Sequence, residues 1–375
     1  MNSKFDIRPY RKGDEEGIVQ LLQLVFNGWP HLDLRCTAMD HWKWKYESDH
    51  IRRPYISVAV SDEEIIGCHH SIPFWVKIGD KIRLCTSSFD YAVHPDFRKM
   101  GISTKMGTDL SLEWRRKEGV YLDYHITGNP ILIRSFSKSK PRFPYKITNL
   151  VWIEDFKKQL QAMPVENPWK VRLGYVTLKL INNLKKSFTV SHNSGQDVDI
   201  IEIDEFDNRI DDFWAETSDF HNFIVVRNRG FLNWRYCDPR GGKFIVKQAV
   251  EKEKVLGYVV AYINYYRKNY PIGYIVDLLT LPHRIDVAKI LVDKVLSYFV
   301  DNGVNIVNYQ VVNGHPYQKI LNNYGFLNSR IEINMFYNPI VANGELIELE
   351  RDKPERTHIS WGDHDVLPVT IPRYQ

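Results

Sequence analysis

The chain contains 375 residues, of which 43% are apolar and 26% are charged, and its formal net charge is +4. This length is sufficient for two domains, and the composition is ordinary for a soluble globular protein. Because nucleic-acid binding requires a concentrated basic face, the mild charge gives no reason to expect a nucleic-acid partner.

The cysteine spacing and the lack of a long apolar run indicate the cellular compartment of the protein. The four cysteines are scattered, without a CxxC pair, at Cys36, Cys68, Cys85 and Cys237. This spacing favours reduced, packed thiols over a disulfide framework or a zinc site. The N-terminus MNSKFDIRPYRKGDEE is polar, and no uncharged run reaches the roughly 20 residues that span a bilayer. We therefore expect a cytoplasmic protein without integral membrane association.

The first predicted elements are a short strand, a helix and a strand pair. The strand FDIRPY (5–10) leads to IVQLLQLVF (18–26), whose apolar spacing predicts a helix. Two alternating strands follow, YISVAV (55–60) and IIGCHHSIPFWV (65–76), and the polar turn SDEE joins them.

Strands and helices then alternate. We expect strands at SSFDYAV (87–93) and VYLDYHIT (120–127), and helices at TKMGTDLSLEWRRK (104–117) and PILIRSFSKS (130–139). This alternation predicts a mixed sheet flanked by helices.

The sequence repeats itself at a slowly falling offset. HWKWKYESDH (41–50) and FLNWRYCDPR (231–240) share a tryptophan and a tyrosine 190 positions apart, and later matches stand 187 and then 184 positions apart. The matched pairs are Trp44 and Trp234, Tyr46 and Tyr236, Gly67 and Gly257, Asp90 and Asp277, Pro95 and Pro282, Gly119 and Gly303, and Asn129 and Asn313. Their order and nearly constant offset indicate two copies of one fold.

The predicted fold class is therefore α/β (α+β), with two tandem domains, each a mixed, mostly antiparallel sheet flanked by helices. We place an N-terminal domain at 1–150, a connector at 151–197, a C-terminal domain at 198–340 and a polar tail at 341–375. The connector contains a basic amphipathic segment, which we interpret as a helix bridging an interdomain groove rather than a membrane-surface helix.

The segment VHPDFRKMGIS (93–103) lies between a predicted strand and a predicted helix. Pro95 removes a backbone donor and ends strand pairing, and Gly101 lets the backbone approach a ligand closely. The first N–H groups of a helix have no intrahelical partner and carry positive character, to which Arg98 and Lys99 add charge. The segment therefore predicts a site for a phosphate or pyrophosphate.

With this segment the sequence resembles the GNAT superfamily of N-acetyltransferases. The family signature is a hydrophobic strand, V-x-P, and then [R/Q]-x-x-G-x-[G/A]. The corresponding residues are Tyr91 to Val93, Pro95, and Arg98 to Ser103. Ser103 departs mildly from the small residue at the end of the signature.

The resemblance implies an acyl-CoA cosubstrate, acetyl-CoA in the first place, in a cleft where two central strands splay apart. Backbone groups of Tyr91, Ala92 and Val93 would pair with the pantetheine arm, and Asn129 would lie near the pantetheine and the departing thiol. The residues whose N–H groups would hold the pyrophosphate are Arg98, Lys99, Met100, Gly101, Ile102, Ser103 and Thr104.

The second copy lacks the loop chemistry. In LPHRIDVAKI (281–290) Ile285 and Ala288 stand where the first copy has Arg98 and Gly101, and Asp286 would repel a pyrophosphate. We therefore assign acyl-CoA binding to the N-terminal copy alone.

Acyl transfer to an amine needs a base, because a protonated amine with a pKa of about 10 has no lone pair. The candidates are Asp90 on the loop-bearing strand and Asp123 and His125 on the next strand, all expected near the cleft. Strand alternation places Asp123 and His125 on one face. Tandem relatives suggest a further candidate, the chain's own carboxylate at Gln375.

An acid for the departing thiolate is a separate question. The position that carries a tyrosine acid in many relatives is Phe136 here. Either Tyr91, Tyr121 or Tyr124 substitutes, or the thiolate leaves without a dedicated acid.

Together these features predict an acetyl-CoA-dependent N-acetyltransferase acting on a small amine, with an amino sugar as the best single candidate. The alternatives are an aminoacyl or longer acyl transferase of the same tandem fold, and a non-catalytic CoA-responsive binding module. We expect no metal, because the adjacent His69 and His70 point to opposite faces of their strand. The oligomeric state is left open.

Overall fold

The computed structural model describes residues 5–50, 52–138, 140, 142–162, 198–265, 270–341 and 353–364. In the first half of the chain the elements are β1 (Asp6–Pro9), α1 (Glu15–Val25), α2 (Ala38–Tyr46), β2 (Tyr55–Ser61), β3 (Glu64–Ile78), β4 (Lys81–Val93), α3 (Ile102–Lys117), β5 (Leu122–Thr127), α4 (Pro130–Phe136), β6 (Ile147–Ile153) and α5 (Phe156–Ala162).

In the second half the elements are β7 (Asp199–Ile203), α7 (Arg209–Ser218), β8 (Phe223–Val225), α8 (Arg229–Leu232), β9 (Phe244–Glu251), β10 (Lys254–Asn264), β11 (Ile272–Thr280), α9 (Ile285–Asp301), β12 (Ile306–Val312), α10 (Pro316–Asn323) and β13 (Leu327–Pro339). A π-helical turn, η2 (Asn233–Cys237), follows α8, and two 3₁₀ turns, η3 (Pro354–Arg356) and η4 (Trp361–Asp363), follow β13.

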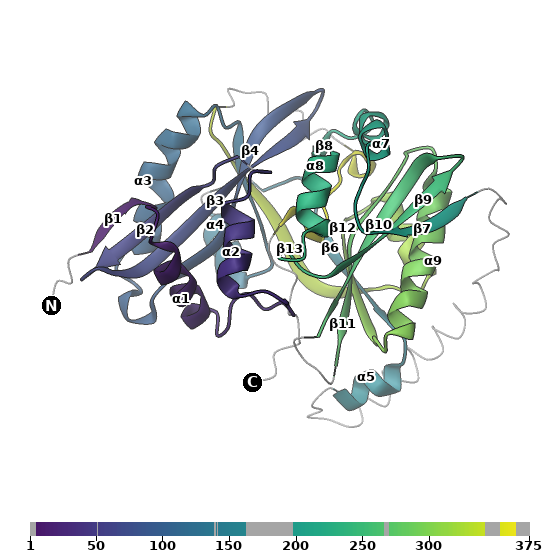
Figure 1. Cartoon of the computed structure of the whole chain (residues 1–375), viewed down its shortest axis with the longest axis horizontal. Coiled ribbons are helices and arrows are strands. Elements are labelled where there is room, and N and C mark those ends of the chain that lie inside the picture. Colours follow the sequence, from purple (N-terminus) through teal and green to yellow (C-terminus); the bar gives the residue numbers. More distant parts are fainter. Residues whose placement is uncertain are drawn as a thin grey trace.

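The strands form one long sheet that runs through both halves of the molecule, with helices packed along it (Figure 1). The strand order is β1-β2-β3-β4-β5-β13-β6-β12-β11-β10-β9-β7, and β8 pairs with β3. This mixed, mostly antiparallel sheet flanked by helices confirms the predicted fold class.

The two halves repeat the same order of strand pairing. In the first half β1, β2, β3 and β4 pair antiparallel and β5 joins β4 in parallel. In the second half β7, β9, β10 and β11 pair antiparallel and β12 joins β11 in parallel. The strand that follows each series is exchanged between the halves: β13 of the second half pairs with β5, and β6 of the first half pairs with β12.

Turn geometry and helix capping explain where several strands and helices begin or end. The β2–β3 turn has positive φ at Asp62 and Glu63, 48° and 65°, as a two-residue hairpin turn requires. The β9–β10 turn repeats this geometry at residues 252–253. At the start of α2, Thr37 Oγ1 accepts a hydrogen bond from Asp40 N at 3.1 Å, and Asp40 accepts one from Thr37 N at 3.2 Å.

In the first half, the helices cover both faces of the sheet. Val58 of β2 packs in the main hydrophobic core together with residues of α1 and α2, whereas its neighbour Ala59 packs in a separate cluster with Ile102 and Met106 of α3. Because adjacent strand residues point to opposite faces, α3 lies on the face opposite α1 and α2.

A pair of tryptophans joins the two halves. The rings of Trp44 and Trp234 stack with centroids 5.3 Å apart. Trp44 Nε1 donates to the carbonyl of Trp234 at 3.0 Å, and Trp234 Nε1 donates to the carbonyl of Trp44 at 3.2 Å. The contact is reciprocal between two residues that the sequence repeat matches to each other.

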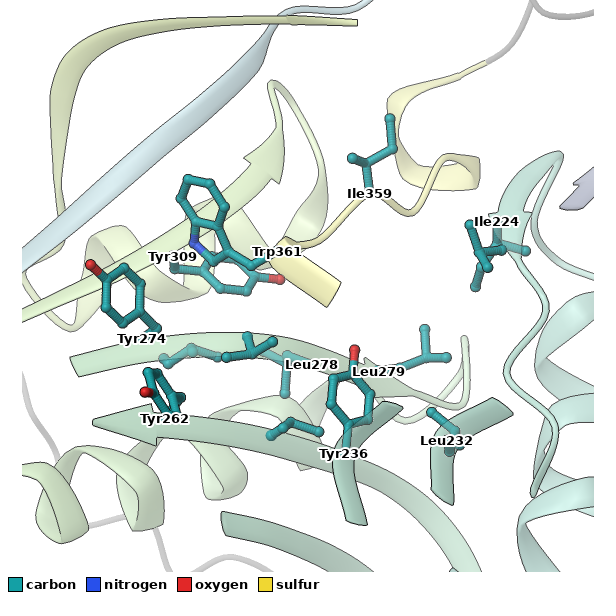
Figure 2. Packing of buried hydrophobic residues seen from close by; sticks show 14 of the residues in the cluster. Ile224, Leu232, Tyr236, Tyr262, Tyr274, Leu278, Leu279, Tyr309, Ile359 and Trp361 are labelled. Atoms are coloured by element: carbon teal, nitrogen blue, oxygen red, sulfur yellow. The ribbon is translucent and has the colours of Figure 1, made fainter. Parts of the chain in front are cut away.

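Residues 353–364, which we call the strap, pack against the second half. Figure 2 shows Ile359 and Trp361 among the buried side chains of this core. The Trp361 and Tyr274 rings meet edge to face with centroids 6.5 Å apart. The strap is thus part of the folded core.

The domain boundaries stay a prediction, since β6 and β13 each pair across the two halves. Most of the predicted connector (163–197) and much of the tail (342–352 and 365–375) lie outside the described residues. Among the described helices, none has both the length and the apolar character needed to cross a membrane.

Candidate active site

The segment predicted to hold an anion joins β4 to α3. A short 3₁₀ turn, η1 (Pro95–Phe97), follows β4, and the chain then turns through Lys99 and Gly101, whose φ values are +66° and +76°. Gly101 is the N-cap of α3, and among the described residues neither a capping side chain nor an acidic residue lies at this helix start. By contrast, α2 begins with a complete capping box.

The start of α3 has the electrostatic character expected of an anion site. Lys105 N bonds to Gly101 O at 3.1 Å, so the N–H groups of Ile102 and Ser103 come too early in the helix to have an intrahelical acceptor. Arg98 and Lys99 are exposed beside them. Backbone donors, the helix dipole and two cations therefore act at one place.

β4 and β5 are paired only near their beginnings. Their parallel register joins Cys85 to Leu122, Thr86 to Asp123 and Ser87 to Tyr124. In the described structure the ladder ends there, although β4 continues to Val93 and β5 to Thr127. Among the residues that the structure describes, no strand pairs with the facing edges over the part of β4 that carries Tyr91, Ala92 and Val93.

Asn129 follows β5 and caps α4, since Ile131 N donates to Asn129 Oδ1 at 2.9 Å. No residue of α4 is buried: Ile131 is 76% exposed and Leu132 is 39% exposed. Phe136, at the position of the family's tyrosine acid, packs on His125 with ring centroids 5.0 Å apart.

Asp123 and His125 belong to one polar cluster on the α3 face of β5. Asp123 accepts from Thr86 Oγ1 at 2.9 Å, lies 3.0 Å from an Arg115 guanidinium nitrogen, and lies 2.9 Å from His125 Nε2. Burial opposes ionisation of Asp123, but His125 and Arg115 outweigh it and hold its pKa below the usual range. Asp123 is thus an ionised, fully engaged carboxylate.

His125 is the first residue of β5 beyond the β4–β5 ladder, and its side chain is 13% exposed. Its Nε2 lies within reach of two groups, Asp123 and the Lys140 Nζ at 2.6 Å. Burial lowers the pKa of Lys140, although Asp123 acts against this. A single nitrogen either donates to Asp123 or accepts from Lys140, and Nδ1 makes neither contact.

Asp90 lies in a different environment. Its carboxylate accepts from Trp29 Nε1 at 2.8 Å, from Lys45 Nζ at 2.8 Å and from Tyr46 OH at 2.5 Å. Burial would raise the pKa of Asp90, but Lys45 and His70 outweigh it and hold that pKa below the usual range.

The three candidate bases, all expected near the cleft, do not lie on one face of the sheet. Asp90 contacts α2 and the segment before it, whereas Asp123 contacts Arg115 of α3. Since α2 and α3 cover opposite faces, the sheet separates the first carboxylate from the other two residues. The prediction that Asp123 and His125 share a face is confirmed by their direct contact.

Tyr91 is the tyrosine nearest the loop. Its hydroxyl donates to the carbonyl of Ser103 in α3, and its ring packs on His69 with centroids 4.8 Å apart. Burial raises the pKa of Tyr91 to about 12, so the phenol is protonated at neutral pH. Tyr121 and Tyr124 are buried, and Tyr124 packs against Phe223 of β8.

The matching place in the second half is built differently. Arg284 at the start of α9 pairs with Asp286 at 3.2 Å and with Glu251 at 3.3 Å. The β11–β12 ladder also ends early, at Ile275 and Tyr309. Beyond that point the strap contacts both strands: His358 Nε2 lies 2.8 Å from Asp277 Oδ1, and His364 Nε2 lies 2.8 Å from Gln310 Oε1.

Residues 6–126 match the family described as "Acetyltransferase (GNAT) domain". This part of the chain is therefore similar to a GNAT domain. This match includes β4, the loop and the start of α3, and it confirms the resemblance read from the loop. No curated protein matches the sequence.

Solved structures share the fold over most of the chain. A probable N-acyltransferase from Enterococcus faecalis has a TM-score of 0.61 at 14% identity, covering 90% of this chain and 72% of that one. N-myristoyltransferase from Saccharomyces cerevisiae, solved with bound myristoyl-CoA and inhibitors, has a TM-score of 0.59 at 10% identity, covering 96% and 87%. A GCN5-related N-acetyltransferase from Anabaena variabilis has a TM-score of 0.59 at 11% identity, covering 90% and 73%. The chain thus has the fold of GNAT acyltransferases.

The side-chain partners of the candidate residues were missed by sequence reasoning. They are Lys45 and Tyr46 for Asp90, Arg115 for Asp123 and Lys140 for His125. Only the tyrosine had a signal, because Tyr46 and Asp90 both belong to the matched repeat pairs. In the described part of the chain, no group of three or more His, Cys, Asp or Glu residues is arranged to hold a metal ion.

Proposed function

We propose that the chain is an acyl-CoA-dependent N-acyltransferase that uses acetyl-CoA to acetylate a small amine, with an amino sugar as the best single candidate. The observation that carries the proposal is the coincidence of two features in the GNAT domain. The β4–β5 ladder ends before Tyr91 to Val93, and the loop that follows β4 leads into the uncapped start of α3.

These two features suit the two ends of CoA. The open edge of β4 offers backbone groups of Tyr91, Ala92 and Val93 to an amide-rich chain such as pantetheine. The loop from Arg98 to Thr104 offers helix N–H groups and two cations to a pyrophosphate. Asn129 begins α4 at the end of β5, on the other side of the open edge. Bound acetyl-CoA would supply the acyl group as an activated thioester.

Among the four candidate catalytic residues, His125 is best suited to take the proton from the attacking amine. Asp90 and Asp123 are ionised and fully bonded, and their lowered pKa values make them weak bases. With Nε2–H donating to Asp123, Nδ1 of His125 keeps a lone pair, and the buried carboxylate fixes the ring. The amine nitrogen then attacks the thioester carbonyl, the C–N bond forms and the C–S bond breaks.

The departing sulfur needs a proton or a stabilised thiolate. Tyr91 is protonated at neutral pH, because its pKa is raised to about 12, and it lies beside the loop. We assign it the role of proton donor to the thiolate, with Phe136 excluded by its chemistry.

Calorimetric titration of free CoA and acetyl-CoA tests the binding site. We expect both to bind the wild type, and Gly101→Asp to weaken binding at least about tenfold, since the new carboxylate repels the pyrophosphate. Gly119→Asp is the matched control, because Gly119 has a φ of +71° and free space around its Cβ position at the other end of the same helix.

Equal loss in both variants would mean that backbone strain, not anion binding, causes the effect. A wild type that binds neither CoA species would refute the proposal. Release of thiol from acetyl-CoA, compared between amino sugars and other small amines, then identifies the acceptor class.

A longer acyl group is the second candidate, favoured by the exposed apolar residues Ile131 and Leu132 on α4. The similar N-myristoyltransferase was solved with a C14 acyl-CoA, as its name states. Competition among acyl-CoAs of increasing chain length decides between the two. Affinity that rises with chain length and falls in Ile131→Ser would support the longer donor.

A further inference from the structure

Asp90 lies at an irregular point of β4, immediately before the strand segment proposed to bind acyl-CoA. In the β3–β4 ladder Cys68 pairs with Ala92 whereas His70 pairs with Phe89, so two residues of β4 stand opposite one residue of β3. This is a β-bulge. Asp90 has a φ of +38°, a left-handed backbone conformation that is strained for a residue other than glycine. Other contacts must hold it there.

Contacts hold both the side-chain carboxylate and the backbone carbonyl of Asp90. Three donors from residues 29–46 reach its carboxylate: Trp29 Nε1, Lys45 Nζ and Tyr46 OH. His70 Nδ1 lies 3.1 Å from its carbonyl oxygen. The side chains of Lys45 and Asp90 are only 6% and 7% exposed, so each buried charge depends on the other.

The second half repeats this arrangement. The β10–β11 ladder also shifts register next to Asp277, the residue matched to Asp90. Asp277 accepts from Arg227 Nε at 3.0 Å and from Tyr236 OH at 3.1 Å, and Tyr236 is matched to Tyr46. In this half α9 carries Asp286 in its first turn, so its start is not an open anion site. The bonded carboxylate therefore occurs with the bulged strand in both halves, including the one that we do not expect to bind acyl-CoA. This favours a structural role for the carboxylate over a role in proton transfer.

We propose that Asp90 is a positioning residue: its bonds to Lys45, Tyr46 and Trp29 fix the β4 bulge and thereby present the backbone of Tyr91 to Val93 to acyl-CoA. This inference rests on the proposed function. It assigns Asp90 to the binding of the cosubstrate and removes it from the set of bases.

The test is the affinity of Asp90→Asn for free CoA, measured by calorimetry without any acceptor. We expect the dissociation constant to rise at least about tenfold. The Michaelis constant for acyl-CoA should rise in parallel, while kcat at saturating acyl-CoA and the shape of its pH profile stay as in the wild type. A base would show the opposite split, since it acts on the amine proton and not on free CoA.

Asp277→Asn is the matched control, because it removes the same kind of buried charge from the other half. It should lower the thermal midpoint but leave CoA affinity within about twofold of the wild type. If Asp90→Asn does not fold, Trp29→Phe removes a single hydrogen bond to Asp90 and should weaken CoA binding to a smaller but measurable degree.

The outcomes separate the two proposals. A wild type that does not bind CoA overturns the proposed function itself. A wild type that binds CoA, with Asp90→Asn (or Trp29→Phe in its place) binding equally well, overturns the positioning role alone. Equal weakening in Asp90→Asn and Asp277→Asn also overturns it, because the cause would then be general destabilisation.

Discussion

The buried guanidinium of Arg227 should be among the most costly side chains to remove. Its side chain is fully buried, and it bonds Asp277 Oδ2 at 3.0 Å and Asp363 Oδ1 at 2.6 Å, with a further bond to the carbonyl of Val225 at 2.9 Å. Arg227→Met keeps a similar apolar length but leaves two buried carboxylates without their cation. Removing one partner of a buried ion pair costs about 3–5 kcal/mol.

The remaining contacts place the expected loss within this range. Asp277 keeps its hydrogen bonds from Tyr236, Tyr258 and His358, and Asp363 keeps those from the backbone and hydroxyl of Ser360. Neither carboxylate is left without donors, so the loss should not exceed the upper limit. We expect the free energy of unfolding to fall by about 3–5 kcal/mol at pH 7.

The effect should depend on pH in a defined direction. Burial would raise the pKa of Asp277, but Arg227 and His358 outweigh it and hold it below the usual range, so ionised Asp277 stabilises the fold above the unfolded-state pKa. Without Arg227 the same burial raises that pKa, and protonation then relieves the unpaired charge. The difference between wild type and variant should therefore shrink as the pH falls from 7 to 5.

Urea unfolding followed by tryptophan fluorescence measures the change, with unchanged m values as the condition for comparing midpoints. Arg209→Met is the control, because the Arg209–Asp207 pair is exposed and such pairs contribute about 0–1 kcal/mol. The double variant Arg227→Met/Asp363→Asn should lose about 1–3 kcal/mol less than the sum of its single variants. A loss at Arg227 no larger than that of the control would refute the reasoning.

Three further outcomes are expected. His125→Gln should lower kcat/KM about 10²–10⁴-fold with CoA affinity unchanged; activity within tenfold of the wild type would place the base elsewhere. Gly257→Ala would put a Cβ 2.7 Å from the carbonyl oxygen of Leu279, so urea unfolding should show a loss of about 1–3 kcal/mol, and an unchanged midpoint would contradict this contact. Burial lowers the pKa of His41 to about 4, so on acidification the unfolded chain binds this proton before the folded chain does. The free energy of unfolding should therefore fall as the pH drops from about 6.5 to about 4, and His41→Gln should reduce this slope by about 1.4 kcal/mol per pH unit. An equal slope in the variant would show that burial does not keep His41 neutral.

Local sequence was sufficient for the strands, the loop and the repeat. The SDEE turn, the strand carrying Tyr91 and the helix after Gly101 all depend on neighbouring residues, and the structure has them close to the predicted places. The helix α2 was missed, although TAMD at 37–40 carries a capping-box signal in Thr37 and Asp40.

Long-range contacts were not predictable in the same way. The face on which Asp90 lies depends on the bulge in β4, because one extra residue reverses strand alternation. Arg115 and Lys140 read as ordinary surface cations in their own segments, and only the packing of α3 and of the chain after α4 brings them to β5. The exchange of β6 and β13 has no local signature at all.

Trp44 and Trp234 each donate a hydrogen bond to the other's carbonyl, so the contact between the halves resembles the interface of an isologous dimer, here formed within one polypeptide. In such an interface each side offers the same patch, and here each side also lends the other its last strand. A fragment that ends after β6, at residue 153, would keep β5 without β13, which covers its edge, and the complementary fragment would leave β12 without β6. We therefore expect the two halves to fold only together, so that expression of the two fragments should give soluble protein only when both are made in the same cell.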